Sequence, residues 1–396
     1  MKKTVLIVSA VFPPEPVVSA NLSYDLANKV HQSGKTVIVI SPRPSRPLNY
    51  AFPIVEASLP FDHIVLDSFV CPQSKLFGRF RESISFGKAT YNYIQQHQNE
   101  ISVIYANTWP LFAQFFLAKA AKRFTIPFFI HVQDIYPESY CHKIPKSLGV
   151  FLYRALVPID RFVLNNAKGV FAISPAMKLH LSRSRGINES KILLARNWQD
   201  DDVFVDAYKP LEGGHDTIRV MYLGSINPTA NVSLIIHAFA HLNQKDYSLF
   251  IVGDGPDKPH CEDLCKQIGI RVSFDTVTPD EVAKKQSQAD LLVLCLKKGV
   301  AQTATPSKLT SYMLSGRPIV ASVDLDSDCA NIIRKAGCGL VVEPENEKEL
   351  CDAITEIAGK SNYELNQLGR AAFEYAKDHL SREHNLKIIV DQLIND

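Results

Sequence analysis

The sequence predicts an α/β protein built from two doubly wound domains. The chain has 396 residues, which is enough for two domains of ordinary size. Short runs that are apolar on both faces alternate with helical patterns, as expected for parallel sheets covered by helices on both sides. A polar, turn-rich stretch near residues 195–217 separates two such series.

The expected strands give the order of elements along the chain. In the first series they are Val5–Ala10, Val37–Ile40, Val103–Tyr105, Phe128–Val132 and Gly169–Ile173. In the second series they are Arg219–Leu223, Tyr247–Val252, Arg271–Phe274, Leu291–Leu294, Pro318–Ala321 and Gly339–Val342. A long last helix over Asn362–Ile394 is expected to break at Ser381 and Arg382.

Composition favours a soluble, cytoplasmic enzyme. The chain is 46% hydrophobic and 21% charged with a net charge of +2, so it lacks the basic excess of a nucleic-acid-binding protein. Its eight cysteines include no CxxC pair and indicate reduced thiols, and His260, Cys261 and Cys265 are only a weak metal candidate. No apolar run approaches the about 18 residues of a membrane span, and the run before Pro13 predicts a core strand rather than a signal peptide.

The stretch Gln302–Ser322 is the most informative part of the chain. A loop with Pro306, Ser307 and Lys308 leads into about two helical turns, Gly316 ends the helix, and a buried strand follows. The start of such a helix offers unpaired backbone N–H groups and the positive end of a dipole. With the Ser307 hydroxyl and the Lys308 charge, it suits a doubly charged phosphate.

Two further loops of the second half carry glycines directly after strands. Gly224 follows the first strand and precedes a helix, with Ser225 beside it. Gly253 and Gly255 flank Asp254 after the next strand. Such glycines let the backbone approach a ligand closely, but they are equally expected in a plain turn that needs a positive φ.

In the first half, polar residues follow the strands at the edge where parallel α/β folds place ligands. Asp134 is the best-placed carboxylate and could orient a substrate hydroxyl or act as its base. His131 lies on the same strand face as Gln133 and points either toward this edge or into the core. Glu138 is expected to cap the next helix and Ser174 another helix, whereas Asn107 and Trp109 are expected to line the site.

These motifs together resemble glycosyltransferase family 4. The resemblance rests on Phe12–Pro16, His131–Ser139, Asn197–Trp198, Val252–Pro256 and Pro306–Ser322, which occur in the order and spacing of that family. It implies the GT-B fold, in which two Rossmann-like domains face each other across a cleft. The first domain would comprise residues 1–205 plus a last helix near 376–396 that crosses back to it, and the second residues 206–375.

The resemblance also implies a function and a set of site residues. The function would be retaining transfer of a hexosyl or N-acetylhexosaminyl group from a nucleotide sugar, probably a UDP-sugar, to a lipid-linked glycan acceptor for capsule or O-antigen, with no metal or other cofactor. The residues implied to bind the donor are Gly224, Ser225, Gly253, Asp254, Gly255, Thr276, Val277, Thr303, Pro306, Ser307, Lys308 and Ser311. Those implied on the acceptor side are Glu15, Ser19, Asn107, Trp109 and Gln133, with Asp134, His131 and Lys308 as catalytic candidates.

The chain departs from the family pattern at one important place. Many relatives carry two glutamates in a Glu-x₇-Glu pattern where this chain has Thr303 and Ser311, so ribose and sugar binding lose two carboxylates. This loss argues against a sugar-nucleotide epimerase and gives some weight to a weakly active regulatory GT-B subunit. A dinucleotide oxidoreductase is disfavoured, because no G-x-G-x-x-G follows any strand.

Two segments of the first half mix cations with aromatic residues. They are residues 74–88 and 142–162, and the second includes Phe151 and Arg154. Such surfaces suit the anionic inner face of a cell membrane that carries a lipid-linked acceptor, although solvated helix faces of this composition are common.

Overall fold

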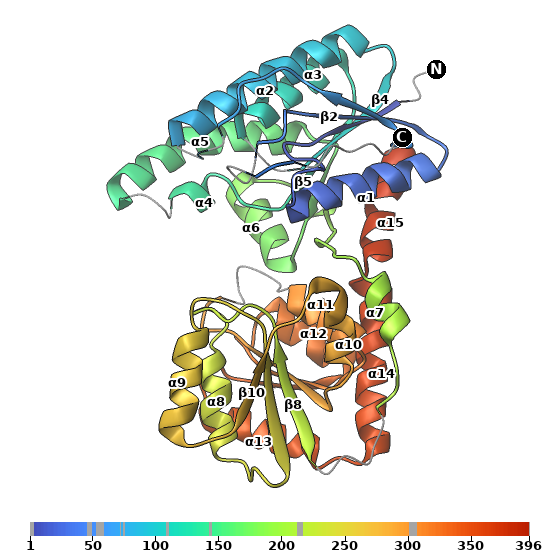
Figure 1. The fold of residues 1–396 in the computed structure, drawn as a ribbon. Coiled ribbons are helices and arrows are strands. Elements are labelled where there is room, and N and C mark those ends of the chain that lie inside the picture. The colour runs from blue at the N-terminus through green and yellow to red at the C-terminus, as the bar shows by residue number, and fades with distance from the viewer. Residues whose placement is uncertain are drawn as a thin grey trace. The chain divides into compact units, whose positions relative to one another are not determined.

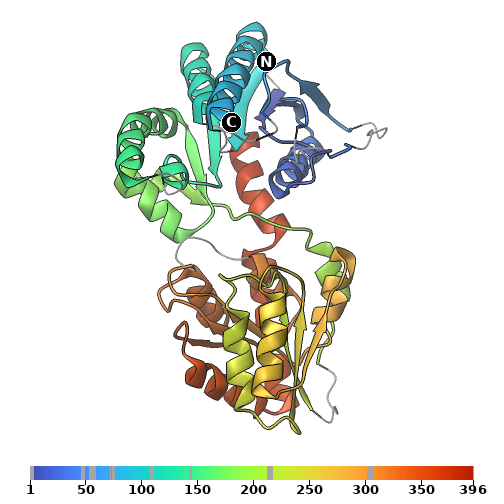
Figure 2. The same ribbon diagram turned by 60° about the vertical axis from the view of Figure 1, so that its left-hand side comes forward.

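The computed structural model describes residues 4–45, 50–52, 59–71, 73, 76–107, 111–141, 145–211, 217–300 and 307–395. The chain divides into two compact units, each an α/β unit with its own sheet (Figures 1 and 2). The first comprises Met1–Asn197 together with Asn385–Asp396, and the second comprises Trp198–His384.

The first unit has a seven-stranded parallel sheet in the order β3-β2-β1-β4-β5-β6-β7. Its strands are β1 (Thr4–Val8), β2 (Thr36–Ser41), β3 (Asp62–Val65), β4 (Ile101–Asn107), β5 (Phe128–Val132), β6 (Gly169–Ala172) and β7 (Ile192–Leu194). Its helices are α1 (Val18–Gln32), α2 (Leu76–His97), α3 (Leu111–Phe124), α4 (Glu138–Cys141), α5 (Lys146–Asn166), α6 (Pro175–Arg185) and the 3₁₀ helix η1 (Glu189–Lys191).

Helices cover both faces of this sheet, which explains why its central strands are apolar throughout. All five residues of β1 and all five of β5 are buried. One face packs against α2, α3, α5 and α6, which contribute Phe86, Leu117, Leu164 and Leu181 to a single core. The other face meets α1, which contacts β1 and β2 (Figure 1).

The second unit has a six-stranded parallel sheet in the order β10-β9-β8-β11-β12-β13. Its strands are β8 (Ile218–Leu223), β9 (Tyr247–Val252), β10 (Val272–Asp275), β11 (Leu291–Cys295), β12 (Ile319–Ser322) and β13 (Gly339–Val342). Its helices are α7 (Asp202–Ala207), α8 (Val232–Ala240), α9 (Lys258–Ile268), α10 (Val282–Gln286), α11 (Ser307–Leu314), α12 (Asp328–Ala336), α13 (Glu347–Ala358) and α14 (Asn362–His379), with the 3₁₀ helix η2 (Pro279–Glu281); α15 (Arg382–Ile394) begins here and continues into the first unit.

Strand β11 shows how the second sheet serves two cores at once. Its side chains alternate between faces, as in any strand. Leu292 and Leu294 pack in the core formed with α11, α12 and α14, whereas Leu291 and Val293 pack in the core formed with α8, α9 and α13. Figure 1 shows α8 and α9 on the opposite side of this sheet from α14.

The structure confirms the eleven strands expected from the sequence, with ends shifted by one or two residues. It also confirms the break between α14 and α15, and the N-cap at Ser174, whose hydroxyl accepts from the Met177 N–H at 3.1 Å. Two strands were missed, β3 and β7. Both are short edge strands. β3 has two polar residues among its four and is partly exposed along its whole length, whereas β7 is apolar but only three residues long.

The turns that follow β8 and β9 pack backbone against backbone. The Gly224 N–H donates to the Val252 carbonyl at 2.8 Å, and the Gly253 N–H donates to the Asp275 carbonyl at 2.8 Å. Gly253 has φ = 147°, and a Cβ atom there would lie 2.0 Å from the Gly224 carbonyl oxygen. Only glycine fits this contact, because the opposing atom belongs to the backbone and cannot rotate away.

We predict that Gly253→Ala lowers the free energy of unfolding by about 3 kcal/mol, as the sum of backbone strain and overpacking. Gly269→Ala is a matched control, since Gly269 has φ = 81° but no atom within 4 Å of the added Cβ. It should cost roughly 1 kcal/mol from backbone strain. Urea unfolding followed by circular dichroism measures both, and equal losses would show that the Gly224–Gly253 contact carries no special constraint.

Candidate functional site

In the second unit, Lys308 lies at the start of α11 and reaches the turn after β8. Its ammonium donates to the Ser225 carbonyl at 3.2 Å and to the Tyr222 hydroxyl, and it lies 4.6 Å from the centre of the Tyr222 ring. A Cβ atom on Gly224 would lie 2.2 Å from Lys308 Cε. The glycine predicted for a tight turn therefore makes room for the predicted phosphate-binding lysine.

Tyr312 fixes α11 against β8, so that Lys308 meets this turn. Its hydroxyl donates to the Leu223 carbonyl at 2.9 Å and accepts from the Leu223 N–H at 2.8 Å. Lys308 and Tyr312 are four residues apart and share one face of the helix. Tyr312 is one position of the Pro306–Ser322 motif, but the sequence predicts no role for it or for Tyr222. Buried tyrosines in a strand and a helix are indistinguishable from ordinary core residues before the packing is known.

No charged group among the described residues balances the positive charge of Lys308. Its hydrogen-bond partners there are a phenol and a backbone carbonyl, so the side chain forms no ion pair with them. Burial lowers the pKa of Lys308 to about 8, and the nearby Cys295 opposes this only slightly. Burial also holds the pKa of the Tyr222 phenol well above its usual range, so Tyr222 stays neutral. An uncompensated cation at a helix N-terminus is an arrangement that favours an anionic ligand.

The structure brings most of the predicted donor residues to this edge of the sheet. The loops after β8 and β9 are joined by the hydrogen bond from the Ile226 N–H to the Asp254 carbonyl at 2.8 Å. Gly224, Ser225, Gly253, Asp254, Gly255 and Lys308 therefore lie in two adjoining turns and the helix beside them. Thr303 and Pro306 lie outside the described residues, and Ser307 is the first residue of α11.

Ser311 already has hydrogen-bond partners inside the second unit. It is 6% exposed, its hydroxyl donates to the Lys308 carbonyl at 2.9 Å, and it accepts from Gln286 at 3.3 Å. The hydroxyl therefore has no proton left to donate to a ligand, and its contact with a ribose stays a prediction.

The loop after β10 holds Thr276 and Val277, two of the residues predicted to bind the donor, and two of its N–H groups are already hydrogen-bonded. The Thr276 N–H donates to the Asp275 carboxylate at 2.8 Å, and the Thr278 N–H donates to Glu281 at 3.0 Å as part of a capping box. These two N–H groups are therefore not available to a ligand.

A cavity of about 440 Å³ lies at the opposite, amino-terminal edge of the second sheet. It is lined by Arg219 and Arg317 among others, and by none of the predicted donor residues. Arg219 binds both carboxylate oxygens of Asp290 at 2.7 and 3.0 Å, so Asp290 has a structural role in the second unit. In the part of the chain that the structure describes, no group of three His, Cys, Asp or Glu side chains is arranged to hold a metal ion.

In the first unit, the predicted acceptor residues are linked by a buried polar network at the carboxyl ends of β1, β4 and β5. Asn107 donates to Ser23 at 3.0 Å, Ser23 donates to the Ser19 carbonyl at 3.0 Å, and the Ser19 hydroxyl donates to Gln133 at 3.2 Å. Glu15 is also buried and accepts from the Ser45 N–H at 2.9 Å. Trp109 lies outside the described residues.

Asp134 and His131, three residues apart, differ in their surroundings. Asp134 is exposed at the end of β5. His131 is fully buried, donates from Nε2 to the Ala195 carbonyl at 2.9 Å, and accepts at Nδ1 from the Tyr105 hydroxyl at 2.9 Å. Burial lowers the pKa of His131 to about 4, so the ring is neutral. His131 is therefore a core residue, and the prediction that it faces the acceptor is wrong because both nitrogens are used in the core.

None of the helices in the described residues combines the length and the apolar character needed to cross a bilayer.

Comparisons with known proteins match both halves of the chain. The family "Glycosyl transferase 4-like domain" matches residues 20–198, and "Glycosyl transferases group 1" matches residues 217–360. An exopolysaccharide phosphotransferase of Streptomyces coelicolor is 30% identical over 150 residues, covering 37% of this chain and 15% of that protein. An uncharacterized glycosyltransferase of Methanocaldococcus jannaschii is 23% identical over 208 residues, covering 50% of each. The chain thus spans half or less of the length of these curated relatives.

Solved structures match over the whole chain. HepE of Anabaena, solved with UDP, has a TM-score of 0.67 at 16% identity, with 100% of both chains covered. The lipopolysaccharide outer core galactosyltransferase WaaB has a TM-score of 0.68 at 16% identity, covering 100% of this chain and 99% of the other. A glycosyltransferase of Rickettsia africae gives 0.65 at 15% identity, with 100% and 99% covered. At these identities the likeness establishes the fold.

With a 4-like domain in its first half, a group 1 domain in its second half and two parallel-sheet units of the matching fold, the chain belongs to the glycosyltransferases of GT-B fold.

Proposed function

We propose that the chain is a retaining glycosyltransferase that moves a hexosyl or N-acetylhexosaminyl group from a UDP-sugar to a lipid-linked or glycan acceptor in surface polysaccharide synthesis. The names of similar proteins support this. HepE was solved with UDP and with UDP-glucose, WaaB is named a lipopolysaccharide galactosyltransferase, and the Streptomyces relative is named for exopolysaccharide.

The observation that carries the proposal is the Lys308 ammonium held over the Gly224 turn with only neutral partners among the described residues. A diphosphate placed against this turn would meet the ammonium and the first N–H groups of α11. When the bond between the sugar C1 and the phosphate oxygen breaks, its electron pair moves to the diphosphate. Lys308 and the helix start would stabilise that negative charge, so that transfer requires no metal ion.

On the acceptor side, we propose that Asp134 orients the attacking hydroxyl or takes its proton. The polar network formed by Asn107, Ser23, Ser19 and Gln133 can accept further hydrogen bonds. Asn107 Oδ1 and Gln114 Oε1 are both buried, and neither has a partner among the described residues. Buried oxygens of this kind normally accept a hydrogen bond, here from an ordered water or from an acceptor hydroxyl.

We also propose that the chain is cytoplasmic and docks peripherally on the inner face of the cell membrane through α5. Leu148, Val150 and Phe151 in its first turns are 54%, 54% and 70% exposed, and Arg154 beside them is exposed. Exposed large apolar side chains next to a cation fit an anionic lipid surface, where a lipid-linked acceptor would be held.

Lys308→Ala should lower turnover of a UDP-sugar by about 100- to 1000-fold, equivalent to roughly 3–4 kcal/mol of transition-state stabilisation. UDP release from UDP-glucose, UDP-galactose and UDP-N-acetylglucosamine, with a polyprenyl-diphosphate-linked sugar as acceptor, measures it. Lys335→Ala, at an exposed position on α12, is the control and should retain wild-type turnover. Full turnover of the Lys308 variant would refute the donor site, and UDP binding without any turnover of the wild type would favour a regulatory subunit.

UDP affinity should fall with rising pH. Burial lowers the pKa of Lys308 to about 8, and only the protonated amine attracts the diphosphate. Affinity should therefore be constant below this pKa and fall about tenfold per pH unit above it, until it approaches that of Lys308→Ala. Lys308→Arg should remove the decline, since guanidinium does not titrate here. Isothermal titration calorimetry between pH 6.5 and 9.5 tests this, and a flat wild-type profile would contradict it.

The wild type should sediment with vesicles containing phosphatidylglycerol more than with neutral phosphatidylcholine vesicles. The double variant Leu148→Ser, Phe151→Ser should lower the bound fraction several-fold on vesicles of both kinds. It removes apolar surface that would be buried in the lipid. Arg154→Glu should weaken binding only to the anionic vesicles, by roughly 1 kcal/mol per charge. Tyr363→Ser, at an aromatic residue that is 73% exposed in the second unit, is the control. Equal sedimentation of all variants would exclude α5 as the docking surface.

A further inference from the structure

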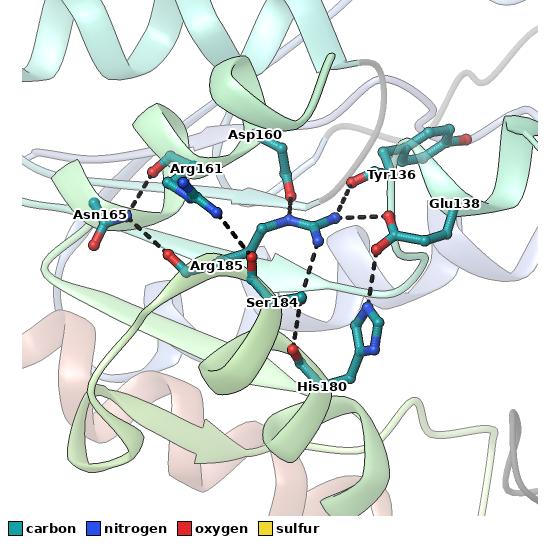
Figure 3. Close-up of polar contacts among 8 residues, drawn as sticks. All are labelled: Tyr136, Glu138, Asp160, Arg161, Asn165, His180, Ser184 and Arg185. Atoms are coloured by element: carbon teal, nitrogen blue, oxygen red, sulfur yellow. Dashed lines mark hydrogen bonds and ion pairs between the residues drawn. The ribbon is translucent and has the colours of Figure 1, made fainter. Parts of the chain in front are cut away.

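Arg185, the last residue of α6, lies buried at the centre of an ion cluster that the sequence did not predict (Figure 3). Its Nε donates to Asp160 of α5 at 2.6 Å, and its Nη2 donates to Glu138 of α4 at 2.6 Å. The same Nη2 donates to the Tyr136 carbonyl at 2.8 Å, and Nη1 donates to the Ser184 hydroxyl at 3.0 Å. One guanidinium thus joins three helices and the loop that follows β5.

Glu138 is held from two sides. One carboxylate oxygen accepts from Arg185 and the other from His180 Nε2 at 2.9 Å. Glu138 is the first residue of α4, and its carboxylate forms an ion pair with α6. Burial by itself would raise the pKa of Glu138, but the hydrogen bonds from Arg185 and His180 outweigh it and leave the pKa below its usual value. Burial raises the pKa of Asp160 to about 6 against the opposing charge of Arg185. Both carboxylates are thus ionised at neutral pH.

The cluster bounds the short loop that carries Asp134. Before Asp134, His131 is fixed in the core by its bonds to Tyr105 and Ala195. After it, Arg185 holds the carbonyl of Tyr136 and, two residues further, the carboxylate of Glu138. Asp134 is thus three residues beyond one fixed point and two residues before the next. A chain advances about 3.3–3.6 Å per residue at most, so little freedom of position remains.

Stability alone is a weak reason for such a cluster. Replacing a buried ion pair by apolar residues of similar size is often neutral or stabilising, because both charges must be desolvated. What the guanidinium supplies that apolar packing cannot is direction, since its planar fork fixes four acceptors in one geometry. A displacement of about 1 Å in a catalytic group can cost on the order of a hundredfold in rate.

We propose that Arg185 is a positioning residue for sugar transfer, holding the loop from Asp134 to Glu138 so that the Asp134 carboxylate stands where the acceptor hydroxyl reacts. This inference rests on the proposed role of Asp134. Arg185 touches no substrate in this account and acts through the loop.

Arg185→Lys and Glu138→Gln test the proposal. Lysine keeps the charge but lacks the fork, and glutamine keeps the shape of Glu138 but loses its charge. In both variants, amide hydrogen exchange in the peptide spanning residues 133–141 should become at least tenfold faster, with β1 and β4 unchanged. Turnover of a UDP-sugar with a soluble polyprenyl-diphosphate-linked acceptor should fall at least tenfold, while the KM for the UDP-sugar stays within twofold.

Arg161→Ala is the matched control. Arg161 lies on α5 and donates to the Ser184 carbonyl of α6 at 3.1 Å (Figure 3). Like Arg185 it links α5 to α6, but this hydrogen bond does not involve the loop from Asp134 to Glu138. It should leave loop exchange and turnover at wild-type values. Asp134→Asn removes the carboxylate charge completely, and its turnover shows the largest loss that misplacing Asp134 could cause.

Unchanged loop exchange in both variants would overturn the proposal, as would faster exchange with wild-type turnover. Exchange that rises evenly over the whole first unit, with turnover per folded molecule unchanged, would show a purely structural cluster and would also overturn it. If the wild type transfers no sugar to any acceptor, the proposed function is wrong, and so is the proposed role of Arg185 in transfer. Hydrogen exchange would still show separately whether Arg185 orders the loop.

Discussion

The donor site proposed for the second unit depends on a steric constraint, namely that the residue after β8 has no side chain. A Cβ atom on Gly224 would lie 2.2 Å from Lys308 Cε. Because it is absent, the ammonium can lie against the Ser225 carbonyl and the Tyr222 ring. The remaining features of this edge maintain that approach. Tyr312 ties α11 to β8, and Gly253 lets the turn after β9 pack beneath the turn after β8.

The two units fix the loops of their proposed sites by different means, and in each unit the means suits the charge that the loop carries. The second unit presents a cation, and it fixes the surrounding turns with backbone contacts between glycines, which add no charge that would neutralise Lys308. The first unit presents a carboxylate at Asp134. Its loop is fixed by Arg185, whose charge is already balanced by Glu138 and Asp160, so the guanidinium is directed at those acids rather than at Asp134.

The sequence predicts the sheets well because central parallel strands are buried on both faces, and each therefore appears as a short apolar run. It misses β3 and β7, since edge strands have no such requirement. At the site, local chemistry is predictable: Lys308 and Gly224 are recognisable from a single loop each. The contact between Lys308 and Gly224 is not predictable from the sequence. The Arg185–Glu138 pair is not predictable either, because the two residues are 47 positions apart along the chain. For His131 the alternation of the strand gives the face, but only packing shows that Tyr105 and Ala195 use both ring nitrogens.

If the proposed donor site is right, the neutral surroundings of Lys308 determine which part of a donor would supply binding energy. Many members of family 4 carry two glutamates where this chain has Thr303 and Ser311, so two carboxylates are absent here. The Ser311 hydroxyl donates to the Lys308 carbonyl inside the unit. In the proposed donor site, charge-assisted contacts would therefore be concentrated on the diphosphate, which all nucleotide diphosphate sugars share. Discrimination between bases would then depend on the loop after β10, where Asp275 and Glu281 already occupy the N–H groups of Thr276 and Thr278. These two bonds order the loop before a ligand binds, which would lower the entropic cost of binding a base there.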